Sequence, residues 1–101
     1  MTENIVTVTA IIKVKPGSEE QAKQVLLQAV TPTRAEAGCL NYDLHQSVSD
    51  PTEFLFHENW ASEEALKAHA DSAGQHRLAL RQQLSGIVDG SPRMTVWRRL
   101  E

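Results

Sequence analysis

The chain has 101 residues, of which 41% are hydrophobic and 23% charged, which is the size and composition of one soluble globular domain. Its formal net charge of −3 comes from ten basic and thirteen acidic residues, so it lacks the positive field that nucleic acid requires. The single Cys39 excludes an internal disulfide framework and a cysteine zinc cluster. The polar start has no signal-peptide pattern, and no apolar run reaches the roughly 18 residues of a membrane span. We therefore expect one domain over residues 1–101 in the cytoplasm, without nucleic-acid or membrane partners.

Residues 5–15 alternate in a run dominated by β-branched side chains, which predicts a strand. One of its faces is wholly apolar. The opposite face, with Ile5 and Ile11 beside its threonines, is too apolar to lie open to water. We infer that the sheet to which this strand belongs is covered on both sides.

A helix is predicted after a Pro-Gly turn. Ser18 stands at the N-cap position and Gln21 at the spacing of a capping box, and apolar residues then recur at helical spacing. Pro32 interrupts this pattern. We expect a kink there, with the helix continuing through residues 33–37 to a stop at Gly38.

Residues 39–46 and 53–60 alternate, and the turn sequence Ser-Asp-Pro-Thr stands between them, which predicts a hairpin. A turn centred near Asp50 and Pro51 fixes the register. The pairs expected opposite one another are Tyr42 with Trp60 and His45 with His57.

A second helix is expected from the cap residue Ser62. A further helical piece follows over about residues 75–87, and residues 93–100 predict the last strand. The residues expected on the inner face of the second helix are Ala65, Leu66, His69 and Ala73.

The order strand, helix, strand, strand, helix, strand predicts an α+β, ferredoxin-like βαββαβ fold, with helices on one face of an antiparallel sheet. Helices cannot cover the second face in this topology. A second copy of the chain is the simplest cover for it.

His69 and Trp60 are the leading candidates for a functional site. The expected connection between them is short, so both should reach the space between sheet and helix. An imidazole titrates near neutral pH and can act as a general base beside an aromatic wall. By residue type alone, a histidine that only packs on a helix face is the more common explanation of such a position.

Glu58 falls on the apolar face of its strand, which it shares with Phe56 and Trp60. A carboxylate there is either desolvated or paired with an arginine such as Arg81 or Arg98. Tyr42 lies on the same expected face of the sheet, where it packs with Trp60 even without a ligand.

His45 and His57, if they face each other across the hairpin, could bind a transition metal. No third ligand stands at a familiar spacing, however, so a polar sheet face or a dimer contact explains them better. No phosphate-binding glycine loop, nucleophile elbow or flavin fingerprint is present, and the sequence indicates no cofactor.

Three short motifs resemble the antibiotic biosynthesis monooxygenase (ABM) family. They are E-x-G-C-x-x-Y at residues 36–42, E-x-W at 58–60 and S-x-E-A-L-x-x-H at 62–69. The resemblance covers nearly the whole chain, and it is nearest to the small bacterial quinol-monooxygenase-like proteins.

The resemblance implies a fold of the dimeric α/β-barrel type, in which two chains form a homodimer by packing sheet against sheet. It also implies an enzyme that oxidises a small aromatic substrate, a quinol or polycyclic phenol, with O₂ to a quinone, without flavin, haem or metal. His69 and Trp60 would be the catalytic residues of that enzyme. The substrate-binding residues would be Tyr42, Phe56, Glu58 and His76.

One departure affects His76. The family often has a Pro-His step after the second helix, whereas this chain has Ser-Ala-Gly-Gln-His over residues 72–76, so His76 stands at a shifted position. Two other functions remain open, because a fold does not determine an activity. One is a non-oxidative isomerase of a small carbonyl compound, and the other is a non-enzymatic dimeric stress protein that binds a ligand or haem.

Overall fold

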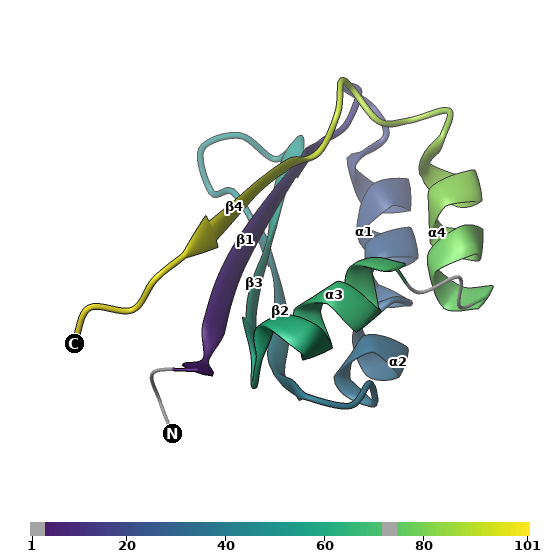
Figure 1. Cartoon of the computed structure of the whole chain (residues 1–101). Coiled ribbons are helices and arrows are strands. Elements are labelled where there is room, and N and C mark those ends of the chain that lie inside the picture. Colours follow the sequence, from purple (N-terminus) through teal and green to yellow (C-terminus); the bar gives the residue numbers. More distant parts are fainter. Residues whose placement is uncertain (1–3, 72–74) are drawn as a thin grey trace.

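The computed structural model describes residues 4–71 and 75–101, which form a four-stranded antiparallel sheet with helices on one side (Figure 1). The strands are β1 (Val6–Lys13), β2 (Cys39–Gln46), β3 (Glu53–Trp60) and β4 (Arg93–Trp97), in the spatial order β2-β3-β1-β4. The helices are α1 (Glu19–Leu27), α2 (Val30–Arg34), α3 (Glu63–Asp71) and α4 (Gln75–Leu84). The α+β, ferredoxin-like prediction is confirmed. Within the described ranges, no helix is long and apolar enough to cross a membrane.

The first helical segment is interrupted, as Pro32 predicts, but it breaks before the proline. A proline cannot bond the carbonyl four residues back, here that of Gln28, and its ring crowds that carbonyl. α1 therefore stops before Gln28, and the chain resumes as the short α2, with Pro32 in its first turn, where no N–H is needed. α2 ends at Arg34 and not at Ala37, and Gly38, with φ +84°, leads the chain into β2.

The helix caps are only partly as predicted. Ser18 precedes α1 at φ −102° and ψ 8°, outside the extended conformation of a capping residue, and it makes no side-chain cap. The capping box of Ser18 and Gln21 is therefore wrong. The predicted cap of α3 is confirmed, because the Oγ of Ser62 accepts the backbone N–H of Ala65 at 3.1 Å.

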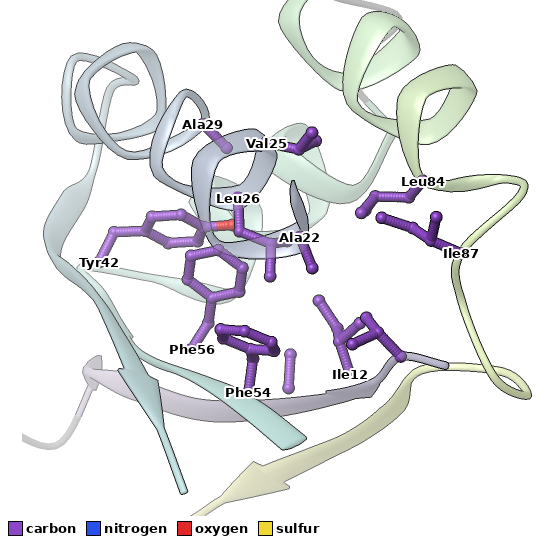
Figure 2. Close-up of a cluster of buried hydrophobic side chains, with 12 residues drawn as sticks. Ile12, Ala22, Val25, Leu26, Ala29, Tyr42, Phe54, Phe56, Leu84 and Ile87 are labelled. Atoms are coloured by element: carbon purple, nitrogen blue, oxygen red, sulfur yellow. The ribbon is translucent and has the colours of Figure 1, made fainter. Parts of the chain in front are cut away.

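The main core lies between the inner face of the sheet and helices α1 and α4 (Figure 2). Phe54 and Leu26 are among its most enclosed side chains, and each such burial contributes about 1.5–3 kcal/mol. Trp60 is fully buried in a smaller cluster with Val6 and Val8, against which Leu66 of α3 packs. The two clusters together hold the helices on one face of the sheet.

The β2–β3 hairpin forms, but the predicted pairs Tyr42–Trp60 and His45–His57 are wrong. The loop contains its own hydrogen bonds, in which Ser47 Oγ accepts the N–H of Asp50 and Asp50 Oδ1 accepts from Thr52. These bonds centre the hairpin one residue earlier than predicted, so the pairing shifts by two residues and each side chain keeps its predicted face. The observed pairs include Tyr42 with Glu58, Asp43 with His57 and His45 with Leu55.

Asp50 makes the hairpin loop sensitive to acid. The hydrogen bonds that its carboxylate accepts from the Thr52 hydroxyl and backbone N–H, with a smaller contribution from Lys13, hold its pKa below the usual value. The stability that these bonds supply is therefore present above about pH 4 and lost as the pH falls through the lowered pKa. In urea titrations, we expect wild type to be more stable than Asp50→Asn at pH 6, by a margin that shrinks below pH 4. A margin that is constant with pH would contradict this.

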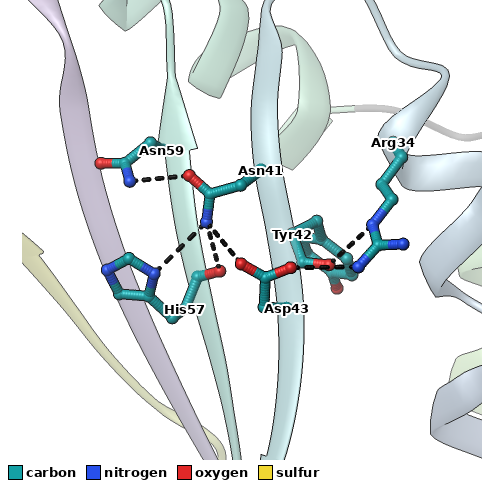
Figure 3. Close-up of polar contacts among 6 residues, drawn as sticks. All are labelled: Arg34, Asn41, Tyr42, Asp43, His57 and Asn59. Atoms are coloured by element: carbon teal, nitrogen blue, oxygen red, sulfur yellow. Dashed lines mark hydrogen bonds and ion pairs between the residues drawn. The ribbon is translucent and has the colours of Figure 1, made fainter.

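The outer face of the sheet carries a polar network (Figure 3). Asn41 Nδ2 donates to Asp43 Oδ2 at 3.0 Å and to the backbone oxygen of His57 at 3.1 Å, and Asn59 Nδ2 donates to Asn41 Oδ1 at 2.7 Å. Arg34 reaches Asp43 from α2 at 3.0 Å. The network joins the edge strand β2 to its neighbour β3.

Apolar side chains also lie on the outer face. Ile11 and Leu55 are paired across β1 and β3 and are half-buried, and Trp97 is 52% exposed. The Trp97 indole donates to Thr9 Oγ1 at 2.8 Å, which holds the ring against the outer face. All four helices lie on the other side of the sheet (Figure 1).

Candidate active site

A cavity of about 180 Å³ lies between the inner face of the sheet and the helices. Its apolar wall is formed by Ala10, Ile12, Ala29, Phe56, Leu80, Leu84, Pro92 and Met94. Its polar groups come from Thr33, Tyr42, Glu58, His69 and Arg81. An apolar cavity with a few convergent polar groups is typical of a small-molecule site. A larger open hollow of about 670 Å³, by the start of α3 and the end of β4, contains none of these residues.

The rings that the sequence singled out lie together, and three of them, Tyr42, Phe56 and His69, line this cavity. Tyr42 stacks on Phe56 with centroids 4.5 Å apart, and Trp60 stacks on His69 at 4.6 Å. The edge of His69 meets Tyr42 at 6.0 Å, so the four rings form one continuous group. Alternation along β2 and β3 supplies the three aromatic rings, and helical spacing after the Ser62 cap directs His69 toward them.

Glu58 is buried on the same strand face and lies two residues before Trp60. Its Oε1 accepts the indole N–H of Trp60 at 2.9 Å, which fixes the plane of the indole ring on which His69 stacks. Of the two arginines suggested as partners for Glu58, Arg81 lines the same cavity, whereas Arg98 lies by the larger hollow. The carboxylate therefore holds Trp60, on which His69 stacks, and Trp60 itself does not line the cavity.

His69 has a carboxylate partner that sequence reasoning missed. Glu36, in the connection between α2 and β2, places Oε1 2.9 Å from Nδ1 of His69. The two side chains are only 20% and 7% exposed, respectively, so water screens the contact weakly. Glu36 was part of the E-x-G-C motif that the sequence analysis noted. Because it lies in a loop, no regular spacing of residues predicted the direction of its side chain. Thr33 and Met94, which also line the cavity, were missed as well.

Cys39 follows Glu36 closely but is poorly suited to act as a nucleophile. Burial raises the pKa of the Cys39 thiol, and the negative charges of Glu36 and Glu58 raise it further. Little thiolate is therefore available at neutral pH. The acid–base group that the geometry favours in this cavity is His69.

The other histidines lie apart from this group or outside the description. His57 belongs to the outer-face network, where its Nδ1 is 3.3 Å from Asn41 Nδ2, and His45 is exposed on β2. His76 is in the first turn of α4, and its side chain falls outside the described part of the chain, as do Ala73 and Gly74 altogether. Among the side chains that the structure describes, which exclude that of His76, no three from His, Cys, Asp or Glu are grouped to hold a metal ion.

Comparison with known proteins gives consistent matches. A family model described as antibiotic biosynthesis monooxygenase matches residues 5–80. "Putative monooxygenase Rv0793" of Mycobacterium tuberculosis is 33% identical over 96 residues, which cover 95% of this chain and 92% of that protein. The crystal structure of PA3566 from Pseudomonas aeruginosa is 32% identical, with a TM-score of 0.88 and coverage of 100% of this chain and 99% of that one. The uncharacterized protein sll1783 of Synechocystis is 33% identical over 64 residues, or 63% of this chain, and the match spans only 44% of that protein's length.

Proposed function

Because this chain belongs to the antibiotic biosynthesis monooxygenase family, we propose that its cavity binds a quinol or a polycyclic phenol, which O₂ oxidises there to a quinone. The observation that carries the proposal is the position of His69. It is a buried, carboxylate-bound imidazole in the wall of a mainly apolar cavity that Tyr42 and Phe56 also line. A hydroxyaromatic ring fits that combination, since it needs apolar contact for its faces and a base for its hydroxyl group.

The size of the cavity favours a small ring system. A dry cavity of about 150 Å³ accommodates benzene, so about 180 Å³ suits a compact aromatic molecule of one or two rings. Phe56 and Tyr42 would pack on the ring, and Trp60 would hold His69 in place beside it. Burial of the ring excludes bulk water from the reacting atoms.

The substrate itself can supply the electrons for this reaction. His69 removes the phenolic proton, and the resulting electron-rich anion passes one electron to O₂. The two radicals combine at the para carbon, and loss of water from the peroxide leaves a quinone, so one oxygen atom enters the ring and the other leaves as water. A quinol already has both oxygens, and the same transfers give the quinone and H₂O₂. Neither route requires flavin, haem or metal.

An oxygen electrode and isotope labelling test the proposal. With 1-naphthol and ¹⁸O₂, we expect enzyme-dependent oxygen uptake and 1,4-naphthoquinone that carries one ¹⁸O atom. With menadiol, we expect menadione and H₂O₂ in equal amounts. Heat-denatured protein is the control for spontaneous oxidation. If a panel of naphthols and reduced quinones showed no uptake above that control, the proposal would be rejected.

A second copy of the chain is our proposal for what covers the outer face. Ile11, Leu55 and Trp97 lie there beside a polar network, and a sheet-to-sheet homodimer would bury all of them. Light scattering at micromolar concentration should give twice the mass of one chain. Leu55→Arg, which places a charge in that face, should shift the protein to the monomer mass, whereas Val48→Arg, on the exposed hairpin loop, should not. A wild-type monomer would contradict the dimer.

A further inference from the structure

We propose that Glu36 is a positioning residue, whose carboxylate holds the imidazole of His69 in the tautomer that presents Nε2 as the proton acceptor. This inference rests on the proposed role of His69 as the base. It assigns to Glu36 a part in proton transfer, although Glu36 is not among the residues that line the cavity.

The contact between the two residues has the geometry of a strong hydrogen bond. Nδ1 of His69 and Oε1 of Glu36 are 2.9 Å apart, although the residues are 33 positions apart in the chain. An ionised carboxylate can only accept hydrogen bonds, so Nδ1 must carry the hydrogen. In the neutral ring the lone pair is then on Nε2, at the opposite edge of the imidazole.

The surroundings leave this ring little freedom to turn. One face of the His69 ring stacks on Trp60, which is itself held by Glu58. Nδ1 is bonded to Glu36 in the loop, and His69 lines the cavity whereas Glu36 does not, from which we infer that the Nε2 edge faces the cavity. The acceptor nitrogen is therefore turned toward the place where a substrate hydroxyl would lie.

Backbone hydrogen bonds hold the loop that carries Glu36. The N–H of Glu36 donates to Thr33 O at 3.0 Å, and its own carbonyl accepts from Cys39 N at 3.1 Å. Two residues on, the carbonyl of Gly38 accepts from Ala61 N at 2.8 Å, which ties this loop to the end of β3. A carboxylate on a fixed loop costs less entropy to orient than one on a free surface chain.

The charge of Glu36 also favours the protonated state of the base. Among the described side chains, the titratable groups near His69 are Glu36, which contacts it, Tyr42, Glu58 and Arg81, which line the same cavity, and Cys39, which lies near Glu36 and Glu58. Glu36 is hydrogen-bonded to Nδ1 of the ring, so its charge stabilises the imidazolium that forms when His69 accepts a proton. Removing its charge should make the ring harder to protonate.

The first test needs no substrate. Ring ¹⁵N NMR of His69 in the full-length protein should show hydrogen on Nδ1 in wild type. In Glu36→Gln, whose side-chain oxygen still accepts, the tautomer should persist while the midpoint of ring titration moves to lower pH. In Glu36→Ala, the preference for Nδ1–H should be lost. Glu64→Gln, the same change on an exposed position of α3, should behave as wild type.

The second test is kinetic, with 1-naphthol and O₂. Glu36→Ala should lower kcat by about tenfold to a hundredfold with little change in KM, because orientation is one part of the about 10²–10⁴ that a positioned base supplies. Glu36→Gln should recover part of this rate, and its activity should rise at lower pH than in wild type. In a His69→Ala background, removing Glu36 should have no further effect.

The outcomes separate this inference from the proposed function. If wild type carries the hydrogen on Nε2, or if Glu36→Ala changes neither tautomer nor titration, Glu36 does not position His69. If the NMR changes occur but no naphthol or quinol is oxidised, Glu36 still positions His69, and the proposed oxidation of phenols and quinols is rejected. Should Glu36→Ala not fold, the near-isosteric Glu36→Gln still decides through the titration midpoint.

Discussion

Replacing His69 with alanine is expected to lower kcat/KM for 1-naphthol oxidation by about 10²–10⁴-fold, the usual contribution of a positioned general base. His69 is the cavity-lining group that combines a partly buried carboxylate partner with an imidazole that can accept a proton near neutral pH. Oxygen uptake under saturating O₂ measures the loss.

His45→Ala is the matched control for this loss. His45 is exposed on β2 and contributes nothing to the cavity, so its replacement should leave the rate within about twofold of wild type. If His69→Ala retained full activity, His69 would not be the base. The oxidation would still occur, and another residue of the cavity would have to accept the proton. If both variants lost activity equally, the effect would not come from the cavity.

Replacing Gly38 with alanine should reduce the free energy of unfolding by about 2–5 kcal/mol. Gly38 has φ +84°, which costs an L-residue about 1–2 kcal/mol, and a Cβ there would collide with Cβ of Ala65 in α3. Overpacking of this kind costs about 1–3 kcal/mol more. Urea-induced unfolding, followed by circular dichroism, measures the change.

Gly90 provides the control that separates the two causes. It has the same φ of +84°, but a Cβ at Gly90 has no atom within 4 Å, so Gly90→Ala should show only the backbone cost of about 1–2 kcal/mol. Adding Ala65→Gly to Gly38→Ala removes the colliding atom and should recover part of the loss, less about 1 kcal/mol for glycine in a helix. Equal effects of Gly38→Ala and Gly90→Ala would show that the approach of α3 to this loop does not matter.

The strand faces could be predicted because the period of a strand is strict. Alternation along residues 53–60 assigns Phe56, Glu58 and Trp60 to one side, and any even register shift preserves that assignment. This is why the error in the hairpin pairs did not displace a single ring of the site. The pairs themselves depended on the side-chain hydrogen bonds of Ser47 and Asp50 within the loop, which apolar patterning does not reveal.

The partner of His69 could not be predicted for a related reason. Glu36 lies in a connection between a broken helix and a strand, where no period tells which way a side chain points. Its direction depends on where α2 ends, and that end was predicted at Ala37, three residues later than Arg34, where the helix stops. Had the helix continued, Glu36 would have been a helical position and not part of the loop that leads into β2.

The two tryptophans divide between the two faces of the sheet, and this has a practical consequence for spectroscopy. Trp60 is fully enclosed beside the cavity, whereas Trp97 is half exposed on the outer face. Their emission should therefore differ, with Trp60 in the blue and Trp97 further to the red. In Trp97→Phe protein, the fluorescence comes from Trp60 and should respond to changes at the His69 ring beside the cavity, and in Trp60→Phe protein it comes from Trp97 and should respond to whatever covers the outer face. One small chain thus contains two independent optical probes, one for each side of its sheet.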